Sequence, residues 1–247
     1  MARDQIEGRN PVREALRAGR PITRLLVADG AAARGPLAEI ISSARAAGVR
    51  VDRVPREKLD RMATSRAHQG VIAETEGFRY RSWREGLARA QERGEKPLLL
   101  ALDGITDPGN LGALLRSAEA AGAHGVVIPS RRAAEVTAVV EKASAGALGH
   151  LILDRVVNLN RALEEIRTAG VWVVGLDGGA PGTLWTCELL TEPVALVIGA
   201  EGRGLSRLIA ERADALVRIP MAGRIGSLNA ASAGAVALFE TARRRHA

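Results

Sequence analysis

Two short runs of this sequence are apolar at every position, Leu98–Leu102 (LLLAL) and Val194–Gly199 (VALVIG). A strand with one face in water alternates apolar and polar residues, so unbroken apolar runs indicate strands that are covered on both faces. Strands of this kind form parallel sheets with helices packed on either side. The two runs therefore predict an α/β fold built on a parallel sheet.

From Pro97 onward, expected strands alternate with helical segments. The expected strands are Leu98–Asp103, Gly125–Pro129, Leu151–Val157, Val171–Asp177, Val194–Gly199 and Leu216–Pro220. The expected helices are Leu111–Ala121, Ala133–Ala145, Leu159–Ala169, Leu205–Arg212 and a last long helix from Ser227 to Arg245.

The first part of the chain predicts a smaller α/β unit. Its expected strands are Thr23–Asp29, Val49–Pro55 and Val71–Glu74, and its expected helix is Pro36–Ala47, which ends at Gly48. A polar stretch with three aromatic residues follows. We expect a first domain over residues 1–77, a linker over 78–96 and a second domain over 97–247.

The basic charge is unevenly distributed between these parts. Residues 1–97 contain 20 Lys and Arg against 13 Asp and Glu, whereas residues 98–247 contain 15 of each. A GC-rich genome would explain why 32 of the 35 basic residues are Arg, but not this asymmetry. A localised basic excess favours a polyanion partner, such as nucleic acid, over a merely solvated basic face.

Several classes of protein are disfavoured by composition. Cys187 is the only cysteine, which excludes an intrachain disulfide and a multi-cysteine metal site. The four histidines show no metal-ligand spacing, and no apolar run approaches the roughly 20 residues that span a bilayer. The first ten residues contain no apolar signal core. We therefore expect a cytoplasmic protein that needs no metal and does not associate with a membrane.

The usual nucleotide-binding loops are absent. The first strand of the second domain is followed by DGITDPGN, where Pro108 replaces the glycine turn of a dinucleotide-binding loop. The sequence contains neither a phosphate-binding G-x-x-x-x-G-K-[ST] loop nor a G-x-S-x-G nucleophile turn.

Three other segments follow predicted strands, at the edge where open α/β sheets bind ligands. Asp107–Gly122 contains Asn110 and Arg116, Leu196–Ser206 sets Glu201 among three glycines, and Ile219–Glu240 contains S-L-N before a helix rich in small residues. Each also has a plain structural interpretation. Asn110 and Ser227 are suited to cap helices, a helical arginine is usually solvated, and clustered glycines make turns.

Together and in this order, the three segments resemble the signature motifs of the SpoU/TrmH family of RNA 2′-O-ribose methyltransferases. The family's N-x-G-x-x-x-R-[ST] motif is matched by Asn110, Gly112, Arg116 and Ser117. Its G-x-E-x-x-G motif is matched by Gly199, Glu201 and Gly204, and its I-P-M-x-G-x-x-x-S-L-N motif from Ile219 to Asn229. Two departures are Gly226, where many relatives have serine, and Ala230-Ala231, which replaces a common Val-Ser.

The N-terminal sequence adds to this resemblance. EGRNPVREAL and HQGVIAE are similar to the RNA-binding domain of family members that methylate a guanosine in 23S rRNA (the RlmB type). Members that act on tRNA generally lack that domain. Alternatives are the same reaction on tRNA and a non-catalytic RNA-binding protein.

The resemblance implies a C-terminal α/β knot that dimerises, which the small residues of the last helix would suit, and S-adenosylmethionine as the cofactor. Backbone groups of Gly199, Ile219 and Leu228 are the implied cofactor contacts. We also expect four residues in or next to the same loops to bind the cofactor: Ile198, Ala200, Gly204 and Met221.

The resemblance also implies catalytic roles. Arg116 matches an arginine often proposed as the base, but a guanidinium stays protonated, so we expect it to orient a phosphate and stabilise the developing alkoxide. Glu201 would fix the guanidinium of Arg116 or accept a hydrogen bond from the nucleotide. Ser227 and Asn229 would surround the reacting ribose, and Asn110 completes the set.

Overall fold

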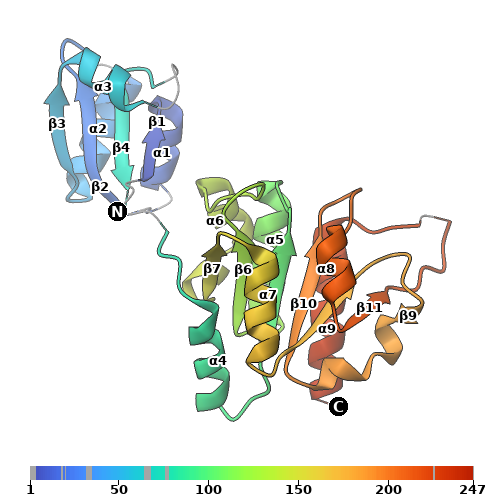
Figure 1. Cartoon of the computed structure of the whole chain (residues 1–247). Coiled ribbons are helices and arrows are strands. Elements are labelled where there is room, and N and C mark those ends of the chain that lie inside the picture. Colours follow the sequence, from blue (N-terminus) through green and yellow to red (C-terminus); the bar gives the residue numbers. More distant parts are fainter. Residues whose placement is uncertain are drawn as a thin grey trace. The chain divides into compact units, whose positions relative to one another are not determined.

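The computed structural model describes residues 4–17, 19, 21–31, 35–63, 68–75, 78–224 and 226–246. The chain forms two compact units, Met1–Arg79 and Tyr80–Ala247, which are coloured blue to cyan and green to red in Figure 1. No helix of the described residues is long and apolar enough to cross a membrane.

The first unit is a four-stranded sheet with helices on both faces. The strand order is β1-β4-β2-β3, in which β2 and β3 are parallel and the other neighbours are antiparallel. The strands are β1 (Asp4–Glu7), β2 (Ile22–Ala28), β3 (Arg50–Val54) and β4 (Val71–Thr75). The helices are α1 (Arg9–Arg17), α2 (Pro36–Ala46) and α3 (Arg56–Met62).

The core of the first unit explains why the apolar pattern of the sequence did not predict three of its elements. The expected strands and the helix at Pro36 are confirmed within two residues, but β1, α1 and α3 were not predicted. Helix α1 buries only Val12 and Ala15, and α3 buries only Leu59, and most of their other residues are polar or charged. Short elements with one or two buried residues give little apolar periodicity.

The two N-terminal segments that resemble an RNA-binding domain lie side by side. The amide of Gly8 donates to the carbonyl of Val71 at 3.1 Å, and the Arg9 guanidinium donates to the carbonyl of Gln69 at 3.3 Å. Gln69 has a φ of 49°, a left-handed conformation that is uncommon for a residue with a side chain. The pairing of β1 with β4, in which Asp4 lies opposite Thr75 and Glu7 opposite Ile72, therefore joins segments that are distant in the sequence.

The second unit is a seven-stranded sheet in which all neighbours are parallel, as predicted. The strand order is β7-β6-β5-β10-β8-β11-β9. The strands are β5 (Leu98–Asp103), β6 (Gly125–Pro129), β7 (Leu153–Val156), β8 (Trp172–Leu176), β9 (Gly182–Thr183), β10 (Val194–Gly199) and β11 (Ala215–Arg218). The short edge strand β9 was not predicted.

Helices cover both faces of this sheet, so the central strands β5 and β10 are buried along nearly their whole length. Leu99 and Val197 pack in a cluster with residues of α4 (Trp83–Glu92), α7 (Leu159–Thr168) and α8 (Arg207–Arg212). The other helices are α5 (Pro108–Ala120), α6 (Ala138–Ser144) and α9 (Ala230–Arg245). Helices α5 and α9 contact each other, and α9 also contacts β10.

The segment expected to be a linker is mostly part of the second unit. Trp83 is 2% exposed in the core cluster, and its amide donates to Asp154 at 2.9 Å. Gly86 packs so closely that an added Cβ would lie 2.8 Å from the carbonyl oxygen of His124. The linker prediction for residues 80–96 is therefore wrong, because α4 buries apolar side chains against the sheet. Trp83 is therefore a core residue of the second unit.

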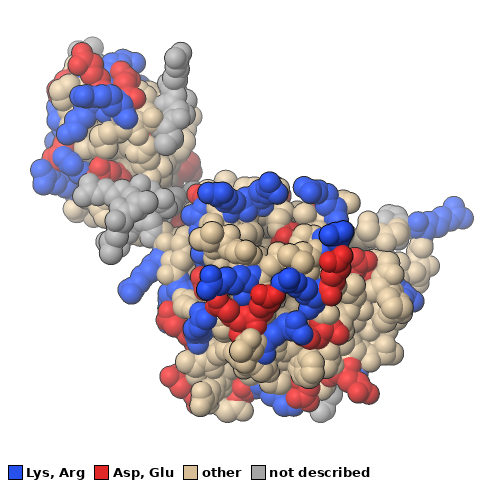
Figure 2. All heavy atoms as spheres, viewed as in Figure 1, with Lys and Arg blue, Asp and Glu red and all other residues tan. Residues whose placement is uncertain are grey.

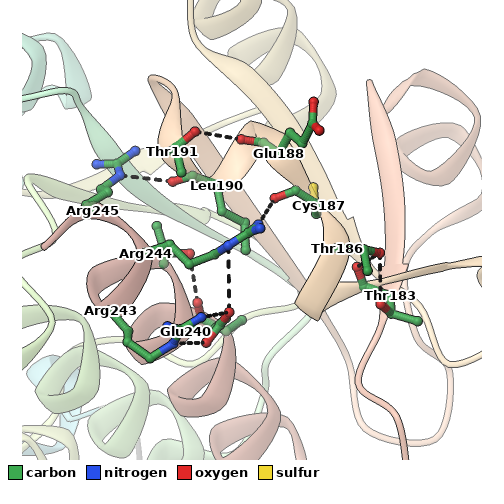
Figure 3. A network of polar contacts seen from close by, with 12 residues as sticks. Thr183, Thr186, Cys187, Glu188, Leu190, Thr191, Glu240, Arg243, Arg244 and Arg245 are labelled. Carbon is green, nitrogen blue, oxygen red and sulfur yellow. Dashed lines mark hydrogen bonds and ion pairs between the residues drawn. The ribbon is translucent and has the colours of Figure 1, made fainter. Parts of the chain in front are cut away.

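The end of the chain is held by arginines of α9 (Figure 3). Arg243 and Arg244 pair with Glu240, and Arg244 also donates to the carbonyl of Cys187. Arg245 donates to the carbonyls of Leu190, Lys96, Pro97 and Glu192. Burial lowers the pKa of the Arg245 guanidinium from its usual value. These bonds fix α9 against segments that lie 53 to 149 residues away in the sequence.

Candidate active site

The three motif segments lie at one edge of the second sheet. Because all its strands are parallel, their carboxyl ends meet at the same edge, where ligands bind in open α/β sheets. The first motif follows β5, the second follows its neighbour β10, and the third follows β11, which is separated from β10 by β8. The order of the strands therefore places the second motif between the other two.

The loop after β10 folds back tightly on itself. The amide of Gly204 donates to the carbonyl of Ala200 at 2.8 Å, and these two residues form an isolated antiparallel bridge. A Cβ at Gly199 would lie 2.2 Å from the carbonyl carbon of Gly204, so only glycine fits there. Gly202 and Gly204 have φ values of 75° and 67°, which favour glycine. The spacing of the motif's glycines thus follows from the shape of this loop.

Asn110 and Glu201 join the first motif to the second. The side-chain amide of Asn110 donates to a carboxylate oxygen of Glu201 at 3.4 Å. Asn110 was considered as a helix cap, but Asp107 caps α5, because its carboxylate accepts from the amide of Asn110 at 2.6 Å. With the cap supplied by Asp107, the side chain of Asn110 is available to Glu201.

A cavity of about 770 Å³ opens beside this pair. Its lining includes Asn110, Ala200, Glu201 and Gly204, so it combines residues of the first and second motifs. No residue of the third motif that the structure describes lines it. The cavity has the size of a small-molecule or nucleotide site.

Arg116 projects from α5 outside the cavity lining. Its side chain is exposed and makes no hydrogen bond or ion pair with the described residues. Of the two roles expected for Glu201, the contact with the Arg116 guanidinium is not seen, and Glu201 bonds to Asn110. The other motif residues of α5 have structural contacts. A Cβ at Gly112 would lie 2.4 Å from the Cβ of Ala143, and the Ser117 hydroxyl donates to the carbonyl of Ala113 at 2.9 Å.

The third motif presents polar and apolar groups to solvent. Ser227 was considered as the cap of the last helix, but Asn229 caps α9, since its side chain accepts from the amide of Ser232 at 2.8 Å. Met221 and Leu228 are 38% and 39% exposed, which is unusual for large apolar side chains. Ile219 is half-buried, Ile198 at the end of β10 is buried, and Ser227 is exposed.

Sequence reasoning missed a basic part of the cavity lining. Arg131 and Arg132 follow β6, which is adjacent to β5, and Arg203 lies within the loop after β10. The signal was available, because Gly125–Pro129 was predicted as a strand and an arginine pair comes soon after its end. Adjacent basic residues at a strand's carboxyl end are candidates for anion binding.

The two units match two known protein families. The family described as SpoU rRNA methylase matches residues 97–239. The family described as RNA 2′-O ribose methyltransferase substrate binding matches residues 5–81.

Relatives and solved structures agree with these matches. A Bacillus subtilis protein assigned by name to the TrmH family of tRNA/rRNA methyltransferases is 42% identical over 98% of this chain and 96% of its own length. The AdoMet-bound rRNA methyltransferase of Sinorhizobium meliloti is 29% identical with a TM-score of 0.62, covering 98% of this chain and 87% of that one. A TrmH/SpoU tRNA-modifying enzyme of A. aeolicus is 26% identical with a TM-score of 0.55, covering 66% of this chain and 84% of that one.

These matches and the three motifs at one edge of a parallel sheet lead to the same result. The motifs lie within the part of the chain that matches the methylase family, and the paired N-terminal segments lie within the part that matches the substrate-binding family. The chain therefore belongs to the SpoU/TrmH family of RNA methyltransferases.

Proposed function

We propose that this protein transfers a methyl group from S-adenosylmethionine to the ribose 2′-hydroxyl of a guanosine in 23S rRNA. The observation that carries the proposal is the hydrogen bond between Asn110 and Glu201 beside a cavity of about 770 Å³ at the carboxyl edge of the sheet. The pair supports the proposal because a carboxylate and an amide of two separate motifs lie together at the edge where open α/β sheets bind ligands.

The residues after β10 and β11 fit S-adenosylmethionine. Gly199 leaves no room for a side chain between the strand and its loop, so backbone groups of Ile198–Gly204 line the edge. Met221 and Leu228 offer exposed apolar surface, which suits an adenine ring. Backbone groups of Ile219 and Leu228 would complete the contacts with the cofactor. Ala200, which directly follows β10, would contribute as well. When bound, the cofactor supplies a methyl group that is activated by the positive charge of its sulfur.

The protein's own residues orient the ribose and stabilise the charge that develops on it. The 2′-hydroxyl is a weak nucleophile, so catalysis depends on holding it in line and stabilising the developing alkoxide. The free guanidinium of Arg116 is suited to pair with an adjoining phosphate. Glu201, with its position fixed by Asn110, is suited to accept a hydrogen bond from the nucleotide. The Ser227 hydroxyl and the Asn229 amide belong to the third motif and would contact the ribose.

The N-terminal unit favours rRNA over tRNA. The similarity to the S. meliloti rRNA methyltransferase covers 98% of this chain, whereas that to the A. aeolicus tRNA-modifying enzyme covers 66%. A tRNA substrate is the alternative, since the B. subtilis relative is named for both RNAs. Either RNA is cytoplasmic, and we propose that compartment.

We also propose that the second unit is knotted and dimeric, as the family resemblance implies. The contact of α9 with α5 and β10, after the chain has left the sheet at β11, is compatible with a threaded C-terminus. Gly234, one of the small residues of α9, packs within the unit, since an added Cβ would lie 2.3 Å from a side-chain atom of Leu114, so this residue is not available to an interface. Phe239, which is 50% exposed, is a better candidate for the interface.

One experiment tests the reaction and its substrate together. Ribose methylation would be mapped in 23S rRNA and tRNA from a strain that lacks the gene and from a complemented strain. We expect one guanosine in 23S rRNA to lose its 2′-O-methyl group and to regain it on complementation. Loss of a site in tRNA would select the alternative substrate, and an unchanged methylation map with inactive purified protein would contradict the reaction.

A further inference from the structure

The cavity at the carboxyl edge contains more basic side chains than the three motifs account for. Arg131 and Arg132 lie after β6, and Arg203 lies in the loop after β10. All three are exposed, and none makes a hydrogen bond or ion pair with the part of the chain that the structure describes. In Figure 2, basic side chains gather along the upper edge of the second unit, where these strands end in Figure 1.

The carboxylates of the same cavity are already engaged. Asp103 accepts from the amide of Ser206 at 2.6 Å, and Asp107 accepts from the amide of Asn110 at 2.6 Å. Glu201 accepts from the side chain of Asn110. The acidic groups therefore fix the loops of the protein, whereas the guanidinium groups are left for a ligand. A cavity with unpaired arginines is suited to an anion.

The loop that carries Arg131 and Arg132 is anchored on both sides of the pair. Before it, the carbonyl of Ser130 accepts from the Arg155 guanidinium at 3.2 Å. After it, the amide of Ala134 donates to the carbonyl of Ile105 at 2.8 Å. A loop that is fixed before binding loses little conformational entropy when it takes up a ligand.

Further contacts hold the far end of this loop. The amide of Val136 donates to the Tyr80 hydroxyl at 3.4 Å, and the Arg155 guanidinium lies 5.6 Å from the centre of the Tyr80 ring. Glu135 pairs with Arg155 as well. Arg155 therefore serves the loop structurally, which distinguishes it from the unpaired arginines. Arg132 itself has a φ of 57°, a left-handed conformation that is uncommon for a residue with a side chain and often occurs at functional sites.

We infer that Arg131, Arg132 and Arg203 form an RNA phosphate clamp, which holds the phosphodiester backbone next to the nucleotide that is methylated. The inference rests on the proposed function and adds to it a set of positioning residues at positions that the three motifs do not specify. Arg131 and Arg132 would act together on one side of the Asn110–Glu201 pair, and Arg203 on the side of the glycine loop. A guanidinium group binds phosphate through two parallel hydrogen bonds, which orient the phosphate in addition to attracting its charge.

The test compares the full-length protein with three substituted forms of it. R131Q/R132Q removes both charges, R131K/R132K keeps them without the planar fork, and R203Q tests the second side. R93Q is the matched control, because Arg93 is also exposed, lies in the same unit and is outside the cavity. The probe is an unmodified in vitro transcript of 23S rRNA. Methyl-transfer kinetics and RNA affinity at several salt concentrations are measured, together with the binding of S-adenosylhomocysteine.

We expect R131Q/R132Q to lower kcat/KM for RNA by about tenfold or more, mainly through KM, with cofactor affinity within twofold of wild type. The slope of log affinity against log salt should fall by about one to two, since each lost phosphate contact removes roughly 0.7–0.9. In R203Q, the decreases in log kcat/KM and in the salt slope should be about half as large, since one guanidinium is removed instead of two. R131K/R132K should recover the salt slope but only part of kcat/KM.

Other outcomes separate this inference from the proposed function. If R131Q/R132Q and R203Q match R93Q in salt slope and kcat/KM, the clamp is wrong while the reaction stands. If the wild-type protein methylates no RNA, the proposed function is wrong, and the salt slopes still decide whether these arginines bind phosphate. Loss of cofactor binding in R131Q/R132Q but not in R131K/R132K would assign the pair to the fold of the loop and would also overturn the clamp.

Discussion

The side-chain amide of Asn110 lies 3.4 Å from a carboxylate oxygen of Glu201 and connects helix α5 with the loop after β10. These residues are 91 positions apart in the sequence and belong to different motifs. Since the amide nitrogen can only donate, Glu201 must accept, and its second oxygen stays available for a nucleotide. Asn110 is therefore a positioning residue for Glu201 in the proposed reaction.

This relationship predicts a coupled loss of activity. Asn110→Ala should lower kcat about tenfold, because Glu201 loses its orientation, and Glu201→Ala should lower it by about 10²-fold. The double variant should be little worse than Glu201→Ala alone, which corresponds to a coupling of about 1 kcal/mol. Single-turnover rates of the four proteins measure this coupling. Effects that simply multiply would show that the two residues act independently.

For Arg116, we expect a substitution to reduce the rate of catalysis without reducing cofactor affinity. Arg116→Ala should lower kcat by about 10²–10³-fold, the range for loss of one oriented donor in the transition state, with cofactor affinity within twofold. The fold should be unaffected, because the side chain is exposed and makes no polar contact with the described residues. Arg116→Lys should recover part of the rate. A single-turnover rate near wild type for Arg116→Ala would contradict the assignment.

Gly199 predicts a steric effect on the cofactor loop. A Cβ there would lie 2.2 Å from backbone atoms of Gly204, so Gly199→Ala must displace the loop. Overpacking of this kind costs about 1–3 kcal/mol of stability, and cofactor affinity should fall with it. Gly149→Ala is the control, since a Cβ at that position meets nothing within 4 Å. Urea unfolding and calorimetry with S-adenosylhomocysteine would compare them, and equal results for both variants would argue against a tight loop.

Much of the second unit could be predicted because its central strands are buried on both faces. The ranges of β5, β6 and β10 agree residue by residue with the predicted strands. The helix caps were less predictable. Asp107 and Asn110 are both good capping residues three positions apart, and only the structure shows that Asp107 caps α5 and that Asn110 bonds to Glu201.

The docking of α4 could not be predicted from local pattern. Its ten residues include four charged side chains, and only Trp83, Gly86 and Ala90 are buried. The close approach at Gly86 depends on the backbone of His124, which is far away in the sequence. Likewise, the small residues of α9 suggested a subunit interface, but one of them, Gly234, packs against Leu114 and Ile198 of the same unit. A small residue indicates close packing without indicating the partner.

His124 predicts that the second unit becomes less stable in mild acid. The side chain is 3% exposed, Nδ1 accepts from the amide of Leu98 at 3.1 Å, and Nε2 lies 2.9 Å from Glu95. Burial lowers the pKa of His124 below its usual 6.5, although Glu95 acts in the opposite direction. The unfolded chain therefore takes up this proton more readily, so the contribution to stability is present above about pH 6.5 and is lost as the pH falls.

Tryptophan fluorescence can follow this effect, because all three tryptophans lie in the second unit. Urea unfolding of the full-length protein at pH 7.5 and at about pH 5 should show a lower midpoint in acid. His124→Gln should be less stable at pH 7.5 but less sensitive to pH. An NMR titration that gives His124 a pKa at or above 6.5 would contradict the prediction.

The boundary between the units predicts which truncated protein will fold. A chain that begins at Tyr80 keeps α4, whereas one that begins at Pro97 exposes the core surface under Trp83. Loss of a buried tryptophan costs about 3–5 kcal/mol. We expect residues 80–247 to fold and bind S-adenosylmethionine, and residues 97–247 to be much less stable. Equal urea midpoints for the two would show that α4 is dispensable.

The same truncation tests the role of charge in RNA binding. With the boundary at Tyr80, the basic surplus is five in the first unit and two in the second, so the asymmetry is smaller than a division at residue 97 suggests. Removal of residues 1–79 should therefore weaken RNA binding and reduce its salt dependence, but the unpaired arginines of the cavity should keep part of both. Titrations of the full-length protein and residues 80–247 with a 23S rRNA fragment at several salt concentrations would measure how much each unit contributes to RNA affinity. Equal affinity and equal salt slope would show that the first unit does not contribute to RNA binding through its charge.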